Sequence, residues 1–130
     1  MRRLSVIVLA GIALLSVACG EKKAQTGHRL VSPAEFARVI NEPGTVTLNV
    51  LGTDAPRIPG TDLEIALERL TSSNSLPPTS TTLAVYCWSG HTSAAAVPVL
   101  EELGYRNIIE LEGGMQAWSA DGRKLVGVSP

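Results

Sequence analysis

The sequence predicts an α/β fold with an open, mainly parallel sheet flanked by helices. Along the chain, apolar residues with the period of a strand alternate with apolar residues at helical spacing. Strands that alternate with helices are typical of parallel sheets. Residues 83–86 are apolar without interruption, which indicates a strand buried on both faces. The 130 residues are enough for one domain of ordinary size.

The first helix is predicted to begin after Ser32. Serine is a favoured N-cap, Pro33 suits the first helical position, and Glu35 completes a capping box. Apolar residues then follow at helical spacing: Phe36, Val39 and Ile40. Residues 41–44 end this helix, and residues 45–50 alternate apolar and polar side chains as a strand does.

A second helix is predicted after a turn at residues 58–60. Thr61 and Glu64 have the spacing of another capping box. The apolar face of this helix would consist of Leu63, Ala66, Leu67 and Leu70. Residues 71–81 are rich in serine, threonine and proline, so we expect an exposed loop there.

The C-terminal half continues the alternation of strands and helices. The buried strand at residues 83–86 leads to a helix at residues 92–103, in which Pro98 is expected to cause a kink or a register change. Residues 107–111 form the next strand. A Gly-Gly turn then leads into a short helix that carries Trp118.

Residues 1–19 resemble the signal peptide of a bacterial lipoprotein. Arg2 and Arg3 precede an apolar stretch, residues 6–15, that is shorter than the roughly 20 residues a membrane-spanning helix needs. The Leu-Ser-Val-Ala-Cys sequence that follows resembles a lipobox, which implies lipid attachment at Cys19. Acyl chains would anchor the protein by moving their methylenes out of water. A signal peptide that is cleaved nearby without lipidation is the alternative.

This interpretation divides the chain into four parts. A signal peptide with its lipidation site occupies residues 1–19, a polar linker residues 20–28, the folded domain residues 29–127 and a tail residues 128–130. The mature protein is expected at the cell envelope, lipid-anchored and facing the periplasm or the cell exterior. Cleavage would leave 9 of the 11 basic residues against 12 acidic ones, a net charge of −3. An acidic chain without a basic run is a poor candidate for nucleic-acid binding.

Cys87 directly follows the buried strand and precedes a helix. In an open parallel sheet, ligands bind beyond the carboxyl ends of the strands. The loop that connects strand and helix consists of Trp88, Ser89, Gly90, His91 and Thr92. Its small residues allow a tight turn in which backbone amides converge, and these amides and the helix N-terminus would stabilise a thiolate. Cys87 is therefore the candidate nucleophile, and the loop beside it is a candidate anion-binding site.

Three segments resemble the single-domain rhodaneses. The sequence around Cys87, Val-Tyr-Cys-Trp-Ser-Gly-His-Thr-Ser-Ala-Ala, is similar to the active-site loop of this family. Gly-Tyr-Arg-Asn-Ile from Gly104 and Leu-Glu-Gly-Gly-Met-Gln-Ala-Trp up to Trp118 resemble its closing segment. Ile-Pro-Gly-Thr at residues 58–61 resembles its turn after an early strand. The likeness extends over residues 28–126.

The resemblance implies a sulfurtransferase. The Cys87 thiolate would take sulfane sulfur from thiosulfate or a low-molecular-weight persulfide and hold it as a persulfide. A small thiol, cyanide or a protein thiol would accept that sulfur. The loop amides would hold the charged persulfide, with the hydroxyls of Ser89 and Thr92 as further donors. Neither a cofactor nor a metal is expected.

Two departures from the family leave a non-catalytic alternative open. The usual Asp-Val-Arg after the early strand is Asn-Val-Leu at residues 49–51, and Trp88 and His91 occupy loop positions where basic residues are common. The chain would then be a rhodanese-like module that binds a sulfur species or a partner protein at the cell envelope. A phosphatase of the related fold is set aside, because the loop lacks a phosphate-clamping arginine and has Ser93 six positions after the cysteine.

Overall fold

The computed structural model describes residues 27–127. The predicted signal peptide, Cys19 and most of the predicted linker lie outside the described residues, as does the predicted tail at residues 128–130. Within the described part of the chain, no helix is long and apolar enough to cross a membrane.

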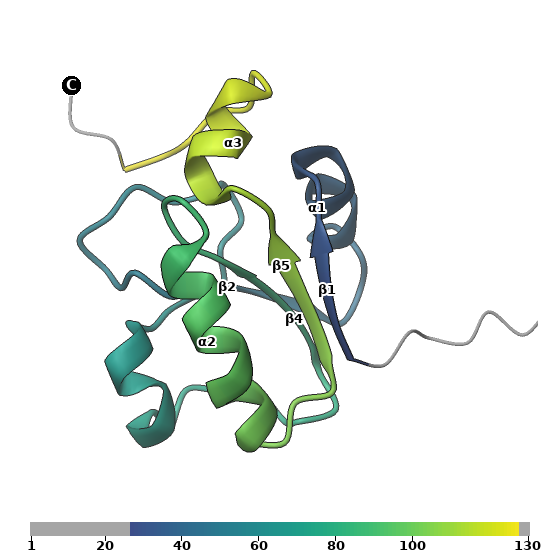
Figure 1. Cartoon of the computed structure of the whole chain (residues 1–130), viewed down its shortest axis with the longest axis vertical. Helices are drawn as coiled ribbons and strands as arrows, with labels where there is room; N and C mark the ends of the chain where they lie inside the picture. Colours follow the sequence, from purple (N-terminus) through teal and green to yellow (C-terminus); the bar gives the residue numbers. More distant parts are fainter. Residues whose placement is uncertain (1–26, 128–130) are drawn as a thin grey trace, which may run out of the picture.

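The centre of the domain is one sheet with the strand order β1-β5-β4-β2-β3 (Figure 1). All of its pairings are parallel. The strands are β1 (Gly27–Val31), β2 (Thr45–Asn49), β3 (Leu63–Glu64), β4 (Thr82–Tyr86) and β5 (Asn107–Leu111). The central strand, β4, is buried on both faces beyond its first residue, as the uninterrupted apolar run predicts. The predicted α/β class with an open parallel sheet is therefore confirmed.

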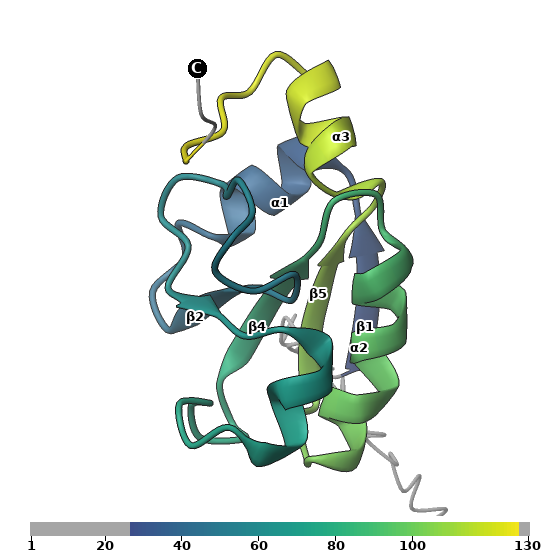
Figure 2. The same cartoon turned by 90° about the vertical axis from the view of Figure 1, so that its left-hand side faces the viewer.

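Helices cover both faces of this sheet. They are α1 (Pro33–Val39), the 3-10 helix η1 (Leu67–Ser72), α2 (His91–Glu102) and α3 (Gly114–Ala120). As Figures 1 and 2 show, α2 and η1 lie on one face, whereas α1 and α3 lie on the other. Each face has its own apolar core, because alternate residues of a strand point to opposite sides. Leu83 and Val85 belong to the core under α2, and Ala84 and Tyr86 to the core under α1.

The helix α1 begins as predicted. Ser32 is its N-cap, and the Ser32 Oγ accepts a hydrogen bond from the Glu35 amide at 3.3 Å. The Glu35 carboxylate pairs with Arg38 in place of the other half of the predicted capping box. Phe36 and Val39 are buried, which confirms the predicted core face of this helix.

The prediction of a helix that begins at Thr61 is wrong. Thr61 Oγ1 does not cap a helix but donates to the Ile58 carbonyl at 2.7 Å and bonds to the Tyr86 hydroxyl, also at 2.7 Å. The next residues form β3, because the amides of Asp62 and Ile65 donate to carbonyls of β2 at 3.0 Å each. Only η1 remains of the predicted helix, since pairing with β2 outweighs the local capping signal.

Two further differences concern β1 and α2. The sequence pattern does not predict β1, which begins at Gly27 inside the predicted linker, residues 20–28. As an edge strand with one neighbour, it buries only its last residue and so has a weak hydrophobic signal. The kink or register change expected at Pro98 does not interrupt α2, where this proline lies on the exposed side.

Candidate active site

Cys87 lies at the carboxyl end of β4, where the chain turns into α2 (Figure 2). The strand delivers its side chain into the core under α2, and only 1% of the residue is exposed. It is a free thiol. The position therefore combines a strand end, a helix start and exclusion of water.

The sulfur of Cys87 accepts two backbone hydrogen bonds. The Gly90 N–H donates at 3.1 Å and the Ser93 N–H at 3.3 Å. Gly90 has a φ of 100°, a left-handed conformation that glycine adopts most readily, and this turn brings the chain back around the sulfur. Both donors are in place before any charge forms on the sulfur, so they stabilise a negative charge without reorganisation.

Cys87 also caps the N-terminus of α2. The first amides of a helix have no partner within the helix and are commonly satisfied by the side chain of the N-cap residue. Here the N-cap is Gly90, which has no side chain to accept a bond. The sulfur takes this role for Ser93, the third residue of the helix. The positive end of the helix dipole is thereby directed at the sulfur.

The Ser93 side chain completes the surroundings of the sulfur. The thiol of Cys87 donates to the Ser93 Oγ at 3.4 Å, and the Ser93 hydroxyl donates to the Gly90 carbonyl at 3.2 Å. A thiolate can no longer donate, so on ionisation the hydroxyl of Ser93 can turn and donate to the sulfur instead. Ser93 lies outside the predicted loop, residues 88–92. The signal that could have found it is the helix start at a glycine, which requires a capping acceptor from elsewhere.

Within the predicted loop, Gly90 is the residue whose amide bonds to the sulfur of Cys87. Trp88 and His91 are exposed, Trp88 by 44% of its surface. Ser89 and Thr92 are half-buried, and among the described contacts of the sulfur neither hydroxyl takes part. The described partners of the Cys87 sulfur itself are thus Gly90 and Ser93.

The backbone of the Cys87 loop rests directly on the start of α3. The Met115 N–H donates to the Cys87 carbonyl at 2.9 Å, and the Gln116 N–H donates to the Trp88 carbonyl at 3.0 Å. Gly114 permits this approach, because a Cβ at its position would lie 2.5 Å from the Cys87 oxygen. The Gly-Gly turn therefore fixes the loop with no side chain between the two backbones.

Tyr86 fixes the strand end on the opposite face of the sheet. Its hydroxyl accepts a hydrogen bond from the Ile58 N–H at 3.0 Å and bonds to the Thr61 hydroxyl at 2.7 Å. Burial raises the pKa of Tyr86, an effect that these two hydrogen bonds partly oppose. The cluster ties the turn at residues 58–60 to the residue that precedes the cysteine.

The Cys87 loop contains no lysine or arginine, and the end of β2 carries a buried asparagine. Asn49 is fully buried, and its side chain accepts from the Leu51 N–H at 3.0 Å and donates to the Pro56 carbonyl at 3.4 Å. It builds a local turn and is not available to a substrate. Neither residues 87–93 nor residues 112–118 contain a lysine or an arginine. In the stretch from residue 27 to 127, no three His, Cys, Asp or Glu side chains are grouped to hold a metal ion.

Comparison with known proteins relates this arrangement to one family. The rhodanese-like domain matches residues 30–121. The chain belongs to the rhodanese-like family. None of the curated proteins matches it.

Solved structures of rhodanese-like proteins have the same fold. A rhodanese-related protein from Thermoplasma volcanium is 29% identical, with a TM-score of 0.62 over 75% of this chain and 97% of that one. A rhodanese homolog from the bacterium Thermus thermophilus is also 29% identical, with a TM-score of 0.57 over 68% of this chain and 99% of that one. A Rhodopseudomonas palustris protein of unknown function, described as a possible tyrosine phosphatase, is 20% identical, with a TM-score of 0.60 over 75% of this chain and 83% of that one. This last likeness shows the fold alone.

Proposed function

We propose that this rhodanese-like protein is a sulfurtransferase that carries sulfane sulfur as a persulfide on Cys87. The observation that carries the proposal is the pair of backbone N–H donors, from Gly90 and Ser93, on the sulfur of Cys87. A cysteine that serves only as a small apolar residue needs no such donors. A sulfur that bears negative charge during a reaction does need them.

In the first half-reaction, the Cys87 thiolate attacks the sulfane sulfur of the donor. With thiosulfate, the new S–S bond forms at Cys87 as the S–S bond of thiosulfate breaks, and its electron pair leaves on sulfite. The outer sulfur of the resulting persulfide then carries the negative charge. The amides of His91 and Thr92, the first two residues of α2, have no partner within the helix and are available to this outer sulfur.

In the second half-reaction, an acceptor removes the outer sulfur. Cyanide or a thiolate attacks it, the bond to Cys87 breaks, and the electron pair returns to the Cys87 sulfur. The two N–H donors thus face a thiolate at the start and end of each cycle. A protein thiol is a further acceptor class, since Trp88 lies exposed next to the cysteine.

The second candidate is a non-catalytic module that binds a sulfur species or a partner protein. Two observations favour it. Cys87 is 1% exposed, so a donor reaches the sulfur only if the surrounding residues move. Asn49 replaces the usual acid at the end of β2 and is used in a local turn.

Intact-mass analysis separates the two candidates. The reduced full-length protein would be measured in detergent before and after addition of thiosulfate or glutathione persulfide. Sulfur transfer predicts a gain equal to one sulfur atom that cyanide removes and that Cys87→Ser lacks. Cys87→Ser should keep the circular dichroism of the folded protein, because the change is nearly isosteric. No gain with either donor would support the binding module.

The proposal includes a location at the cell envelope, with the domain anchored by lipid on Cys19 and facing the periplasm or the cell exterior. The lipobox-like sequence before Cys19 supports it. Fractionation of cells that express wild type and Cys19→Ala tests it, since the variant should leave the membrane fraction. An unchanged membrane fraction would contradict lipidation at this cysteine.

A further inference from the structure

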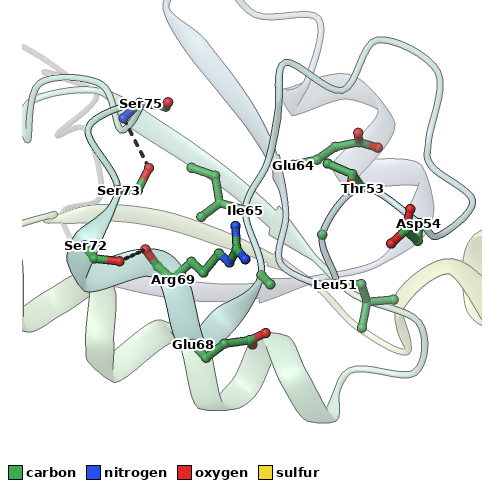
Figure 3. Close-up of a pocket in the computed structure, with 12 residues that line it drawn as sticks. Leu51, Thr53, Asp54, Glu64, Ile65, Glu68, Arg69, Ser72, Ser73 and Ser75 are labelled. Atoms are coloured by element: carbon green, nitrogen blue, oxygen red, sulfur yellow. Dashed lines mark hydrogen bonds between the residues drawn. The ribbon is translucent and has the colours of Figure 1, made fainter.

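A cavity of about 550 Å³ lies beside the candidate active site (Figure 3). Residues 51–54, which follow β2, form one wall, and residues 64–66 form a second. Side chains from η1 and from the loop after it close the third side. This volume is within the range of sites for small molecules, which typically occupy about 300–1,000 Å³.

The cavity presents charges of both signs that are not paired with each other. In Figure 3 the Arg69 side chain extends from η1 toward the middle of the lining residues, while Asp54 and Glu64 stand on the far side with Thr53. Among residues 27–127, the guanidinium of Arg69 and the carboxylates of Asp54 and Glu68 have no ion-pair partner. An unpaired cation and two unpaired anions therefore line one space.

One acceptor in the cavity is buried without a hydrogen bond. Glu64 Oε1 has no hydrogen-bond partner within the described chain, although Arg57 Nη1 lies 3.8 Å from it. A buried polar atom of this kind costs free energy until a donor satisfies it. This oxygen is enclosed and has Arg57 as its cation, so Asp54 and Glu68 remain the carboxylates of the cavity that are free for a ligand.

The wall of the cavity formed by residues 51–54 follows β2, the strand next to the one that leads to Cys87. The Val50 N–H donates to the Tyr86 carbonyl at 3.1 Å, so the chain after β2 runs alongside the chain after β4. Neighbouring strands lie about 4.8 Å apart. Leu51 both lines the cavity and packs against the core that contains Cys87. Cys87 does not itself line the cavity and is 1% exposed, so the residues between the cavity and the sulfur must move before transfer.

We propose that this cavity binds the zwitterionic α-amino acid group of a low-molecular-weight thiol, and so orients that thiol as the sulfur acceptor of Cys87. Arg69 binds the carboxylate, for which a guanidinium has a matching pair of donors. Asp54 and Glu68 receive the ammonium. A dianion such as thiosulfate matches these carboxylates poorly, and a simple cation leaves Arg69 unused. This inference rests on the proposed function, because it names the acceptor class of the same site.

The transfer step is balanced without a further reagent. The acceptor thiolate attacks the outer sulfur of the Cys87 persulfide and forms a new S–S bond. The bond between that sulfur and Cys87 breaks, and its electron pair remains on Cys87 as a thiolate. The transferred sulfur keeps the negative charge that it carries in the Cys87 persulfide, so the product is the persulfide anion of the acceptor.

The experiment measures kcat/KM for three acceptors with the full-length protein and thiosulfate as donor. Cysteine carries both charges, N-acetylcysteine lacks the ammonium, and cysteamine lacks the carboxylate. The ratio of variant to wild type is compared within each acceptor, so that differences in thiol reactivity cancel. Arg38→Met is the matched control for Arg69→Met, since Arg38 is exposed on α1 and pairs with Glu35.

Arg69→Met is expected to lower the variant-to-wild-type ratio of kcat/KM about tenfold for cysteine and N-acetylcysteine relative to cysteamine, because these two acceptors lose a charge-assisted hydrogen bond. The change should act mainly through KM. The double change Asp54→Asn with Glu68→Gln is expected to lower the ratio for cysteine and cysteamine relative to N-acetylcysteine. Equal ratios for all three acceptors in both variants would overturn the inference.

A binding measurement separates this inference from the proposed function. S-Methylcysteine keeps the zwitterion and has no thiol, so its binding requires no persulfide chemistry. Calorimetric titration should detect binding to wild type and Arg38→Met and weaker binding to Arg69→Met. If Cys87 gains no sulfur but this pattern is found, the cavity assignment stands and the proposed function fails. If cyanide removes sulfur from Cys87 while S-methylcysteine shows no Arg69-dependent binding, the cavity assignment fails alone.

Discussion

Replacement of Gly114 by alanine should destabilise the domain and disturb the Cys87 loop. Gly114 has a φ of 58°, and an alanine in this left-handed conformation costs roughly 1–2 kcal/mol. The new Cβ would lie 2.5 Å from the Cys87 oxygen, and overpacking of this kind adds roughly 1–3 kcal/mol. We therefore expect Gly114→Ala to lower the free energy of unfolding by roughly 2–5 kcal/mol and to slow persulfide formation on Cys87.

Gly122→Ala is the matched control. Gly122 has a φ of 79° but no atom within 4 Å of its virtual Cβ, so this change carries only the conformational cost of roughly 1–2 kcal/mol. Urea unfolding of both variants, followed by circular dichroism, gives the two losses of stability. Persulfide formation is then followed by mass. Equal losses of stability in the two variants, or an unchanged rate of persulfide formation in Gly114→Ala, would refute the argument that the missing side chain at Gly114 allows α3 to contact the loop.

Three further predictions concern the sulfur, the buried tyrosine and the anchor. Ser93→Ala should lower the free energy of unfolding, measured with urea, by about 1–2 kcal/mol and slow the alkylation of Cys87 by iodoacetamide, because the Gly90 carbonyl and the sulfur lose a partner. Ser119→Ala, a change at an exposed serine, is the control. Equal effects of the two changes would argue against a role for the Ser93 hydroxyl. Because burial raises the pKa of Tyr86, the unfolded chain ionises first above pH about 10, and stability falls there by about 1.4 kcal/mol per pH unit. The stability gap between wild type and Tyr86→Phe should therefore narrow above that pH in urea titrations, and a constant gap would contradict it. Cys19→Ala should move the protein from the membrane fraction to the soluble fraction.

The parts that the sequence predicts well are those whose signals are local. The apolar run of β4 and the following Gly90 locate the strand end and the turn, because burial on both faces and a left-handed φ each restrict the residue types allowed. The same holds for the start of α1, where Ser32 and Pro33 act within one turn of the helix.

The parts that the sequence misses depend on contacts between distant segments. Thr61 has the sequence pattern of a helix cap. In the structure its hydroxyl bonds to Tyr86 and the amides that follow it pair with β2, so this segment forms β3 instead. In the sequence, Ser93 does not differ from other helical residues. Its role depends on the glycine N-cap, which has no side chain to accept the Ser93 N–H, so that this N–H donates to the Cys87 sulfur. The cavity around Arg69 requires three separate segments to be in place and has no linear motif.

The pairing of β1 with β5 has a consequence for how the chain folds. Gly27 lies opposite Asn107, 80 positions later in the sequence, so within residues 27–127 the first strand pairs only with the last one. Contacts between such distant residues slow folding, because the loop entropy is lost before the pairing is gained. A chain that emerges from its N-terminus cannot close this sheet until residue 111 is free. During that interval the apolar central strand is unprotected, so the chain depends on rapid completion of the sheet, or on a chaperone, to avoid aggregation.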